Sequence, residues 1–334
     1  MKKFVLPSVR LSVVQAANTY CVIATRNEEQ FYFYGQGHFA SSETQDALKN
    51  GFDSPTDEFL GFLCDHDLVF SPTDGTIERL CGNHSRQLSY LQARYGVKTA
   101  ELILTSLDNA CCAIVGVGGI GSHIAEHLCR IGVKRLVLVD HDTVERSNLN
   151  RQILYTENDI GKRKVDAAKY RLISIHRKSE LHAFETIDEY INSTAFDRTT
   201  MVFVSADEQQ FLLRQKLARA CYPLGKSYMF IGYSGSTLRI GPMSLGGVGS
   251  CGACASLLSD LSDVTKDLSH RFQAAASGYA NNAVGGAMAV ERWLGALGGA
   301  TEEAGTLLIA LSDFTRRTIR GDAISGCPVC EQKR

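Results

Sequence analysis

The 334-residue sequence predicts an α/β fold, in which a doubly wound, mostly parallel sheet is preceded by a small α+β module. Two observations predict the sheet. A glycine-rich run follows one apolar strand pattern and opens the helix after it, as in Rossmann-like folds. Strand and helix patterns alternate in the order of βαβ units, over residues 111–117, 122–131, 135–139, 162–175, 201–205 and 209–221.

The N-terminal residues carry a different pattern. Polar capping residues open two short helices, near Ser42 and near Asp57. Alternating or apolar runs before them predict three strands, over residues 9–14, 20–24 and 30–34. Strands followed by helices in so short a stretch predict a small α+β module with a winged-helix-like order of elements. The predicted parts of the chain are this module at 1–80, a helical connector at 81–108 and the principal domain at 109–334.

Composition and charge exclude several classes of function. The chain is 44% hydrophobic and 21% charged, and its formal net charge of −1 gives no basic footprint for nucleic acid. No apolar run approaches the roughly 20 residues that span a bilayer. The first residues imitate a signal peptide, but Pro7 and Arg10 interrupt them, and their alternation fits a strand. We therefore expect a cytoplasmic protein with no nucleic-acid partner and no membrane attachment.

The central motif is the run Gly116, Gly118, Gly119 and Gly121, which follows one strand and opens a helix. Glycines let the backbone approach a phosphate closely, and the helix N-terminus presents free N–H groups to the anion. Asp140 ends the next strand, where a carboxylate can accept a hydrogen bond from a ribose hydroxyl. Together these residues predict a nucleotide site. The alternative is a glycine-rich turn that only packs the helix on the sheet.

The residues beyond the second strand bear on which nucleotide fits. Asn148 and Arg151 follow that strand, and a basic run that ends at Lys164 opens the next helix. Amides and cations at the carboxyl ends of strands suit a triphosphate better than a dinucleotide, so we expect a nucleoside triphosphate. Asp207, at the end of a later strand, can hold Mg²⁺, which takes one or two carboxylates and keeps several waters. For most of the basic run, the alternative is a solvated helix face.

At these residues the sequence resembles the ThiF/MoeB family, the bacterial relatives of ubiquitin-activating enzymes. The resemblance covers about Ser106 to Cys330. It rests on the Gly-Val-Gly-Gly-Ile-Gly run, Asp140, Asn148-x-x-Arg151-Gln152, Lys164 and Ser205-Ala206-Asp207, with two Cys-x-x-Cys pairs behind them. It implies that a carboxylate attacks the α-phosphate of ATP and releases pyrophosphate, a reaction for which positioning and charge stabilisation suffice. It also implies that Asp140 binds the ribose, that Asp207 lies beside Mg²⁺, and that the phosphates are bound by Asn148, Arg151 and Lys164.

Eleven cysteines are a high count for a chain of this length, and four of them stand in two Cys-x-x-Cys pairs. The pairs are Cys251 with Cys254 and Cys327 with Cys330. Four thiolates with this spacing suit a tetrahedral structural Zn²⁺, in a closed site that has no open position for catalysis. The alternatives are reduced buried thiols and a redox-active pair.

The sequence also bears on other classes of function. His123, Glu126 and His127 match an inverted zinc-peptidase motif on one helical face, but that helix must pack against the sheet while it faces the nucleotide. The glycine run, taken alone, is also compatible with an NAD-binding oxidoreductase. A catalytically silent binding subunit also stays open, although the presence of Arg151 and Lys164 argues against it.

Sulfur-carrier and ubiquitin-type activators often carry a cysteine that receives the acyl group. Residues 255–326 contain no cysteine, and Cys221 is interpreted as a core thiol, so no thioester step is expected. The resemblance is closer to the branch of the family that modifies ribosomally made peptides in the biosynthesis of microcin C and pantocin A. Shared-looking stretches of that branch include Ser85–Leu88, Gly232-Tyr233 and Asn281-Asn282.

That branch implies a role for the N-terminal module. Residues 1–80 would grip the leader of a precursor peptide by adding it as a strand, the alternative being a stabilising or dimerising extension. Arg86 stands where the family reaches the ATP of a partner subunit, which implies a homodimer. We therefore expect ATP-dependent adenylation of a carboxyl group on a precursor peptide, leading to phosphoramidate formation or cyclisation of a Glu side chain. The alternative is activation of the C-terminal glycine of a sulfur-carrier protein.

Overall fold

The computed structural model divides the chain into two compact units, Met1–Thr105 and Ser106–Arg334. It describes residues 3–6, 9–16, 19–26, 29–36, 41–50, 52–66, 68–70, 85–177, 179–206, 210–234, 237–247, 251, 277–299, 305–319, 327 and 329–330. The boundary between the units falls inside one helix, α5 (Val97–Asn109). The predicted three-part division, with a separate connector at 81–108, stays a prediction.

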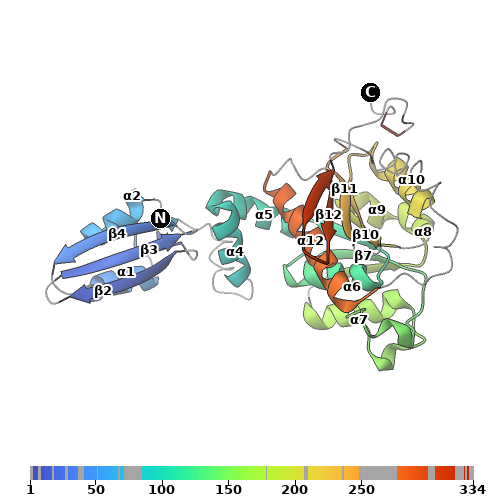
Figure 1. The fold of residues 1–334 in the computed structure, drawn as a ribbon, viewed down its shortest axis with the longest axis horizontal. Helices are drawn as coiled ribbons and strands as arrows, with labels where there is room; N and C mark the ends of the chain where they lie inside the picture. The colour runs from blue at the N-terminus through green and yellow to red at the C-terminus, as the bar shows by residue number, and fades with distance from the viewer. Residues whose placement is uncertain are drawn as a thin grey trace. The chain divides into compact units, whose positions relative to one another are not determined.

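The first unit places its three-stranded sheet before its helices (Figure 1), which confirms the predicted α+β module. Three antiparallel strands form a sheet in the order β2-β3-β4, and two short strands, β1 and β5, pair with one another. The elements are β1 (Phe4–Val5), β2 (Arg10–Ala16), β3 (Thr19–Arg26), β4 (Glu29–Gln36), α1 (Ser42–Asn50), α2 (Glu58–Asp65) and β5 (Val69–Phe70).

One face of the three-stranded sheet packs against the helices, because alternate strand residues are apolar. Val22 of β3 is fully buried in a cluster that includes Phe59 of α2 and the partly buried Phe33 of β4. On the other face, Tyr32 and Tyr34 of β4 are 48% and 73% exposed. The sheet therefore has a core face and an open face, as the period of two in its sequence predicts.

From Ser85 onward, the stretch expected to be a helical connector is helical with one interruption. Two helices occupy it, α4 (Ser85–Tyr95) and α5, and Gly96 separates them. Gly96 has a φ of 80°, in the left-handed region that glycine enters without the steric cost other residues meet there. A glycine inside a helical pattern thus ended the first helix.

The second unit is built on an eight-stranded sheet in the order β13-β12-β11-β10-β9-β6-β7-β8. The five strands from β10 to β8 run parallel, whereas β11, β12 and β13 add antiparallel strands at one end. The predicted doubly wound fold is confirmed, with an antiparallel extension that was not predicted. The strands are β6 (Cys111–Val115), β7 (Arg135–Val139), β8 (Glu180–Phe184), β9 (Met201–Val204), β10 (Ser227–Ser234), β11 (Thr237–Ser244), β12 (Thr306–Ala310) and β13 (Arg316–Ile319).

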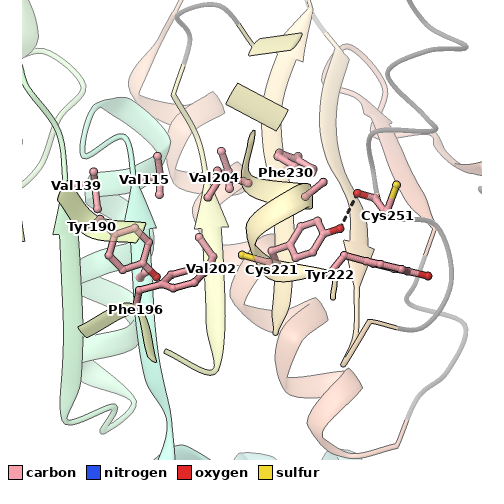
Figure 2. Close-up of a cluster of buried hydrophobic side chains, with 14 of the residues drawn as sticks. Val115, Val139, Tyr190, Phe196, Val202, Val204, Cys221, Tyr222, Phe230 and Cys251 are labelled. Atoms are coloured by element: carbon pink, nitrogen blue, oxygen red, sulfur yellow. Dashed lines mark hydrogen bonds between the residues drawn. The ribbon is translucent and has the colours of Figure 1, made fainter. Parts of the chain in front are cut away.

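Helices cover both faces of this sheet (Figure 1). One face carries α6 (Gly119–Arg130), α7 (Lys164–Ile175) and α12 (Tyr279–Leu297), and the other carries α8 (Ile187–Ile191), α9 (Thr194–Arg198) and α10 (Gln210–Cys221). Figure 2 shows the core on the second face, where Val115, Val139 and Val202 pack with Tyr190 and Phe196. None of the helices in the described parts of the chain is long and apolar enough to cross a membrane.

Small residues let α12 pack closely on α6. A Cβ atom on Gly286 would lie 2.6 Å from the Cβ of His123, and one on Gly285 would lie 3.4 Å from Ile120 Cδ1. On the sheet side, Trp293 meets Phe203 edge to face at 5.7 Å. This packing brings the N-terminus of α12 beside the N-terminus of α6, although the two helices are far apart in the sequence.

Candidate active site

The glycine run forms a tight turn between β6 and α6. Gly116 has a φ of 85°, and its N–H donates to Val139 O at 2.8 Å. A Cβ on Gly121 would lie 1.8 Å from Gly116 O, so only glycine allows the helix to begin this close to the strand. The hydroxyl of Ser205 donates to Gly116 O, and the buried hydroxyl of Tyr155 donates to Val117 O, at 2.8 and 2.7 Å. The turn is thus held from several sides.

Asp140 links this turn to the segment that follows β7. Its Oδ2 accepts from Val117 N at 2.6 Å, and its Oδ1 accepts from Asp142 N at 3.0 Å. Burial raises the pKa of the Asp140 carboxyl, and the Lys164 ammonium nearby acts in the opposite direction. Each carboxylate oxygen has a further lone pair, so these backbone contacts leave acceptor capacity for the predicted contact to a ribose.

Lys164 is the first residue of α7, and only 7% of its side chain is exposed. Its Nζ lies 2.6 Å from Asp142 Oδ2.

Two hydrogen bonds fix the loop that carries Asn148 and Arg151. Glu145 N donates to Asn148 Oδ1 at 3.0 Å, and Arg151 Nη1 donates to Ser147 O at 2.6 Å.

These residues line a cavity of about 770 Å³ at the carboxyl ends of the parallel strands. The cavity lies where the chain order reverses, because β7 lies on one side of β6 and β9 lies on the other. Such switch points are where open α/β sheets bind ligands. The predicted site residues that line it are Gly116, Gly118, Gly119, Asp140, Asn148, Arg151 and Lys164.

Two predicted residues of the nucleotide site stand apart from this set. Gly121 does not line the cavity but lies against the turn, since a Cβ on this residue would meet Gly116 O. Asp207, the predicted magnesium ligand, lies outside the described residues, and its neighbours Ser205 and Ala206 line the cavity.

Two buried amide side chains at the cavity were not predicted as site residues. Gln152 and Asn282 both line it, and both are at least 95% buried, at 5% and 1% exposed. Asn282 Nδ2 donates to Gly278 O at 2.7 Å, and a Cβ on Gly119 would lie 2.5 Å from Asn282 Oδ1. Within the described part of the chain, Gln152 Oε1 and Asn282 Oδ1 have no hydrogen-bond partner. Gln152 belongs to the Asn148-x-x-Arg151-Gln152 motif, which was the available signal for it.

Part of the cavity lining has a different character. Apolar side chains from α8 and α10, Ile187, Leu212 and Leu213, belong to the lining together with the loop before α8. An ion pair between Lys216 of α10 and Asp188 of α8, with Nζ and Oδ2 2.5 Å apart, joins these two helices. The apolar side chains could accept a flat apolar ring, whereas the glycine turn and the cations suit an anion.

Arg86 is an exposed residue of α4 in the first unit. Its predicted contact with the ATP of a partner subunit stays a prediction.

The residues of the inverted peptidase motif have other contacts. Glu126 forms a 2.6 Å ion pair with Arg130, and the His123 ring meets Tyr279 edge to face at 5.2 Å.

Three of the four predicted zinc ligands come together. Cys251, Cys327 and Cys330 are buried, and their sulfur atoms all lie within 4.8 Å of one another. Cys251 Sγ and Cys327 Sγ are 3.6 Å apart, too far for a disulfide but close to the roughly 3.8 Å edge of a tetrahedron with 2.3 Å Zn–S bonds. Cys254 lies outside the described residues. The three residues fit a zinc site.

Cys221 is the cysteine that was considered for a thioester step. It is fully buried in the core shown in Figure 2, and burial raises its pKa to about 12. Because the thiolate is the nucleophile, a thiol with this pKa is unreactive near neutral pH. The environment of Cys221 fits the predicted core role.

A doubly wound sheet with a glycine turn and cations at its switch point defines a nucleotide-binding α/β protein. A model of the ThiF family matches residues 84–329, and the chain belongs to this family. The predicted family is therefore confirmed.

Curated relatives match parts of the chain. The adenylyltransferase and sulfurtransferase MOCS3 of Drosophila yakuba is 34% identical over 134 residues, which is 40% of this chain and 28% of MOCS3. The tRNA threonylcarbamoyladenosine dehydratase of Bacillus subtilis is 43% identical over 82 residues, 25% of this chain and 32% of the dehydratase. The chain thus spans less than a third of the length of these two relatives.

Solved structures match nearly the whole chain. MccB of E. coli, solved with ATP, has a TM-score of 0.69 and 21% identity, with 99% of this chain and 100% of MccB covered. PaaA has a TM-score of 0.64 and 19% identity, with 94% and 99% covered. These likenesses confirm the fold, including its small N-terminal sheet.

Proposed function

We propose that the protein is an ATP-dependent adenylating enzyme that uses the cavity at the switch point. The observation that carries the proposal is the convergence of Arg151 and Lys164 with the glycine turn around one cavity. The turn and the N-terminus of α6 offer backbone N–H groups to phosphates, and the two cations add charge where negative charge develops. A carboxylate oxygen of the substrate attacks the α-phosphorus, and pyrophosphate leaves.

Differences within the cavity lining support an assignment of the reactants. The apolar side chains of α8 and α10 would hold the adenine, with Asp140 at the ribose. The acyl group would enter beside Asn282 and Tyr233, which also line the cavity. Asp207 would hold Mg²⁺, which would supply positive charge to the triphosphate.

We propose further that the acyl group belongs to a ribosomally made precursor peptide. MccB, described as a Microcin C7 biosynthetic enzyme, has been solved in complex with N-formylated MccA, and it aligns with 99% of this chain. The alternative is activation of a sulfur-carrier protein. The MOCS3 relative, which is an adenylyltransferase and sulfurtransferase, favours this alternative. The MOCS3 match covers 40% of the chain, so the likeness along nearly the whole chain favours the peptide.

The first unit supports this choice because its sheet has exposed outer strands. β2 and β4 are the outer strands, so within the described residues each has one edge without a strand partner. Aromatic side chains contribute strongly to cross-strand pairs, and β4 presents Tyr32 and Tyr34 on the open face. We therefore propose that the leader adds beside β4.

The remaining parts of the proposal follow the family resemblance. The enzyme would act in the cytoplasm as a homodimer, with Arg86 of each subunit reaching the partner's ATP. A structural Zn²⁺ would be held by Cys251, Cys327, Cys330 and Cys254. The product would be a phosphoramidate or a peptide cyclised through a Glu side chain.

The substrate class is tested by comparing two acyl donors. A precursor peptide, sought as a short open reading frame beside the gene, should stimulate AMP release from ATP and Mg²⁺, whereas a sulfur carrier that ends in Gly-Gly should not. AMP is measured by chromatography, with ATP alone as the control. Stimulation by the carrier and not by the peptide would transfer the assignment to sulfur-carrier activation.

The leader site is tested by two matched substitutions on the outer strands. Tyr34→Ala should weaken binding of a fluorescent leader peptide about tenfold, because one large cross-strand contact is lost. Val14→Ala on β2, at a residue that is 56% exposed on the same open face, should leave binding within twofold. Equal effects of both substitutions would contradict addition beside β4, and a larger effect of Val14→Ala would point to β2.

A further inference from the structure

We propose that Asp142 is a positioning residue that holds the Lys164 ammonium in the cavity and lowers the affinity of the cavity for a triphosphate. The proposal rests on the proposed ATP site. It adds a carboxylate that the sequence motifs did not include among the site residues. Asp142 lines the same cavity as Lys164.

The first observation is the burial of the cation. An ammonium group that is removed from water is costly unless an opposite charge or hydrogen bonds compensate it. The Lys164 side chain is 7% exposed, and Asp142 Oδ2 lies 2.6 Å from its Nζ. Before a triphosphate binds, Asp142 thus compensates the charge of Lys164. It also holds the ammonium in one position.

The second observation is that the backbone fixes Asp142 itself. Asp142 N donates to Asp140 Oδ1 at 3.0 Å, and Asp142 O accepts from Lys164 N at 2.9 Å. The next residues continue this contact as a small antiparallel clasp, in which Thr143 pairs with Arg163 and Val144 N donates to Lys162 O at 2.8 Å. Asp140, the proposed ribose ligand, and Lys164, the proposed phosphate ligand, are therefore joined through Asp142.

The charge of Asp142 has a consequence for an incoming triphosphate. Its carboxylate is half exposed, and its other oxygen lies 3.4 Å from His141 Nε2. The triphosphate is attracted by the ammonium and repelled by the carboxylate bound to it. Removing the negative charge should strengthen nucleotide binding in the ground state, but it should also release the ammonium from the position that the transition state requires.

The test separates charge from position. In the full chain, Asp142→Asn should lower the Kd for ATP with Mg²⁺ about threefold or more, and it should lower turnover with the acyl substrate about tenfold or more. Asp142→Glu keeps the charge and moves it, so its Kd should stay within about twofold while its turnover falls. Asp166→Asn is the matched control, since it removes one charge from an exposed pair with Arg163 on the first turn of α7, outside the cavity.

Tighter ATP binding together with slower turnover is the result expected, because a merely structural loss would weaken binding. Unchanged or weaker ATP binding by Asp142→Asn, or turnover equal to that of Asp166→Asn, would overturn the proposal. If Asp142→Asn does not fold, the glutamate variant decides, and unchanged turnover in that variant overturns the proposal. ATP binding needs no acyl substrate, so this arm stays readable even if the proposed chemistry is wrong.

Discussion

Replacing Lys164 with alanine should lower the rate of AMP formation on the order of 10²- to 10³-fold. The ammonium is buried beside the glycine turn, where charge aimed at the phosphates is worth more than in water. Arg151→Ala should reduce the rate by about 10²-fold or more for the same reason. The measurement is a single-turnover assay at saturating ATP and Mg²⁺, so that the chemical step is compared rather than binding.

Lys162→Ala is the matched control for this experiment. Lys162 lies two residues earlier, forms a 3.0 Å ion pair with Asp159, and does not line the cavity. Its replacement should change the rate less than about twofold, because an exposed pair contributes little. Equal losses for Lys162→Ala and Lys164→Ala would mean that Lys164 has no specific role at the phosphates.

Replacing Cys327 or Cys330 with serine should remove the bound zinc and lower the stability of the second unit. A structural metal contributes to folding directly, so a loss of about 3–4 kcal/mol is expected, with a Tm about 10 °C lower. The three described sulfurs lie in the core that packs between the sheet and α10, and Tyr228 donates to Cys251 O there at 2.6 Å. Metal content by mass spectrometry and thermal unfolding check the two effects together.

Cys221→Ala separates loss of the metal from loss of core packing. Cys221 lies in the same core but outside the group of three sulfurs. This variant should keep about one zinc per chain while it loses a small amount of stability, because only one buried sulfur is removed. Freshly purified, reduced wild-type protein that contains no zinc would contradict the metal site.

The parts of the site that the sequence predicted are local in the chain. The spacing from Gly116 to Gly121 has a direct steric cause, since a Cβ on Gly121 would lie 1.8 Å from Gly116 O. Asp140 was predicted from its place at the end of the second parallel strand, and it reaches the turn through Val117 N. Lys164 was selected from its basic run by the family motif, and it is the member of the run that lines the cavity.

The parts that were not predicted depend on contacts between distant segments. Asn282 reaches Gly119 only because glycines of α12 let it pack closely on α6, and no local period encodes that approach. Asp142 was not predicted because its role depends on the clasp with the segment before α7. The antiparallel strands β11 to β13 were not predicted, because they do not belong to βαβ units. β11 is the second strand of a hairpin with β10, and β12 pairs with β11 only after the stretch that contains α12.

The bond formed between substrate and nucleotide is tested most directly by isotope transfer. The acyl donor that supports turnover is labelled with ¹⁸O in its reacting carboxyl group and incubated with the enzyme, ATP and Mg²⁺. If a carboxylate oxygen attacks the α-phosphorus, the released AMP should carry one ¹⁸O atom, with at least an equal amount of pyrophosphate. Unlabelled AMP, or ADP with the label in phosphate, would contradict the proposed adenylation.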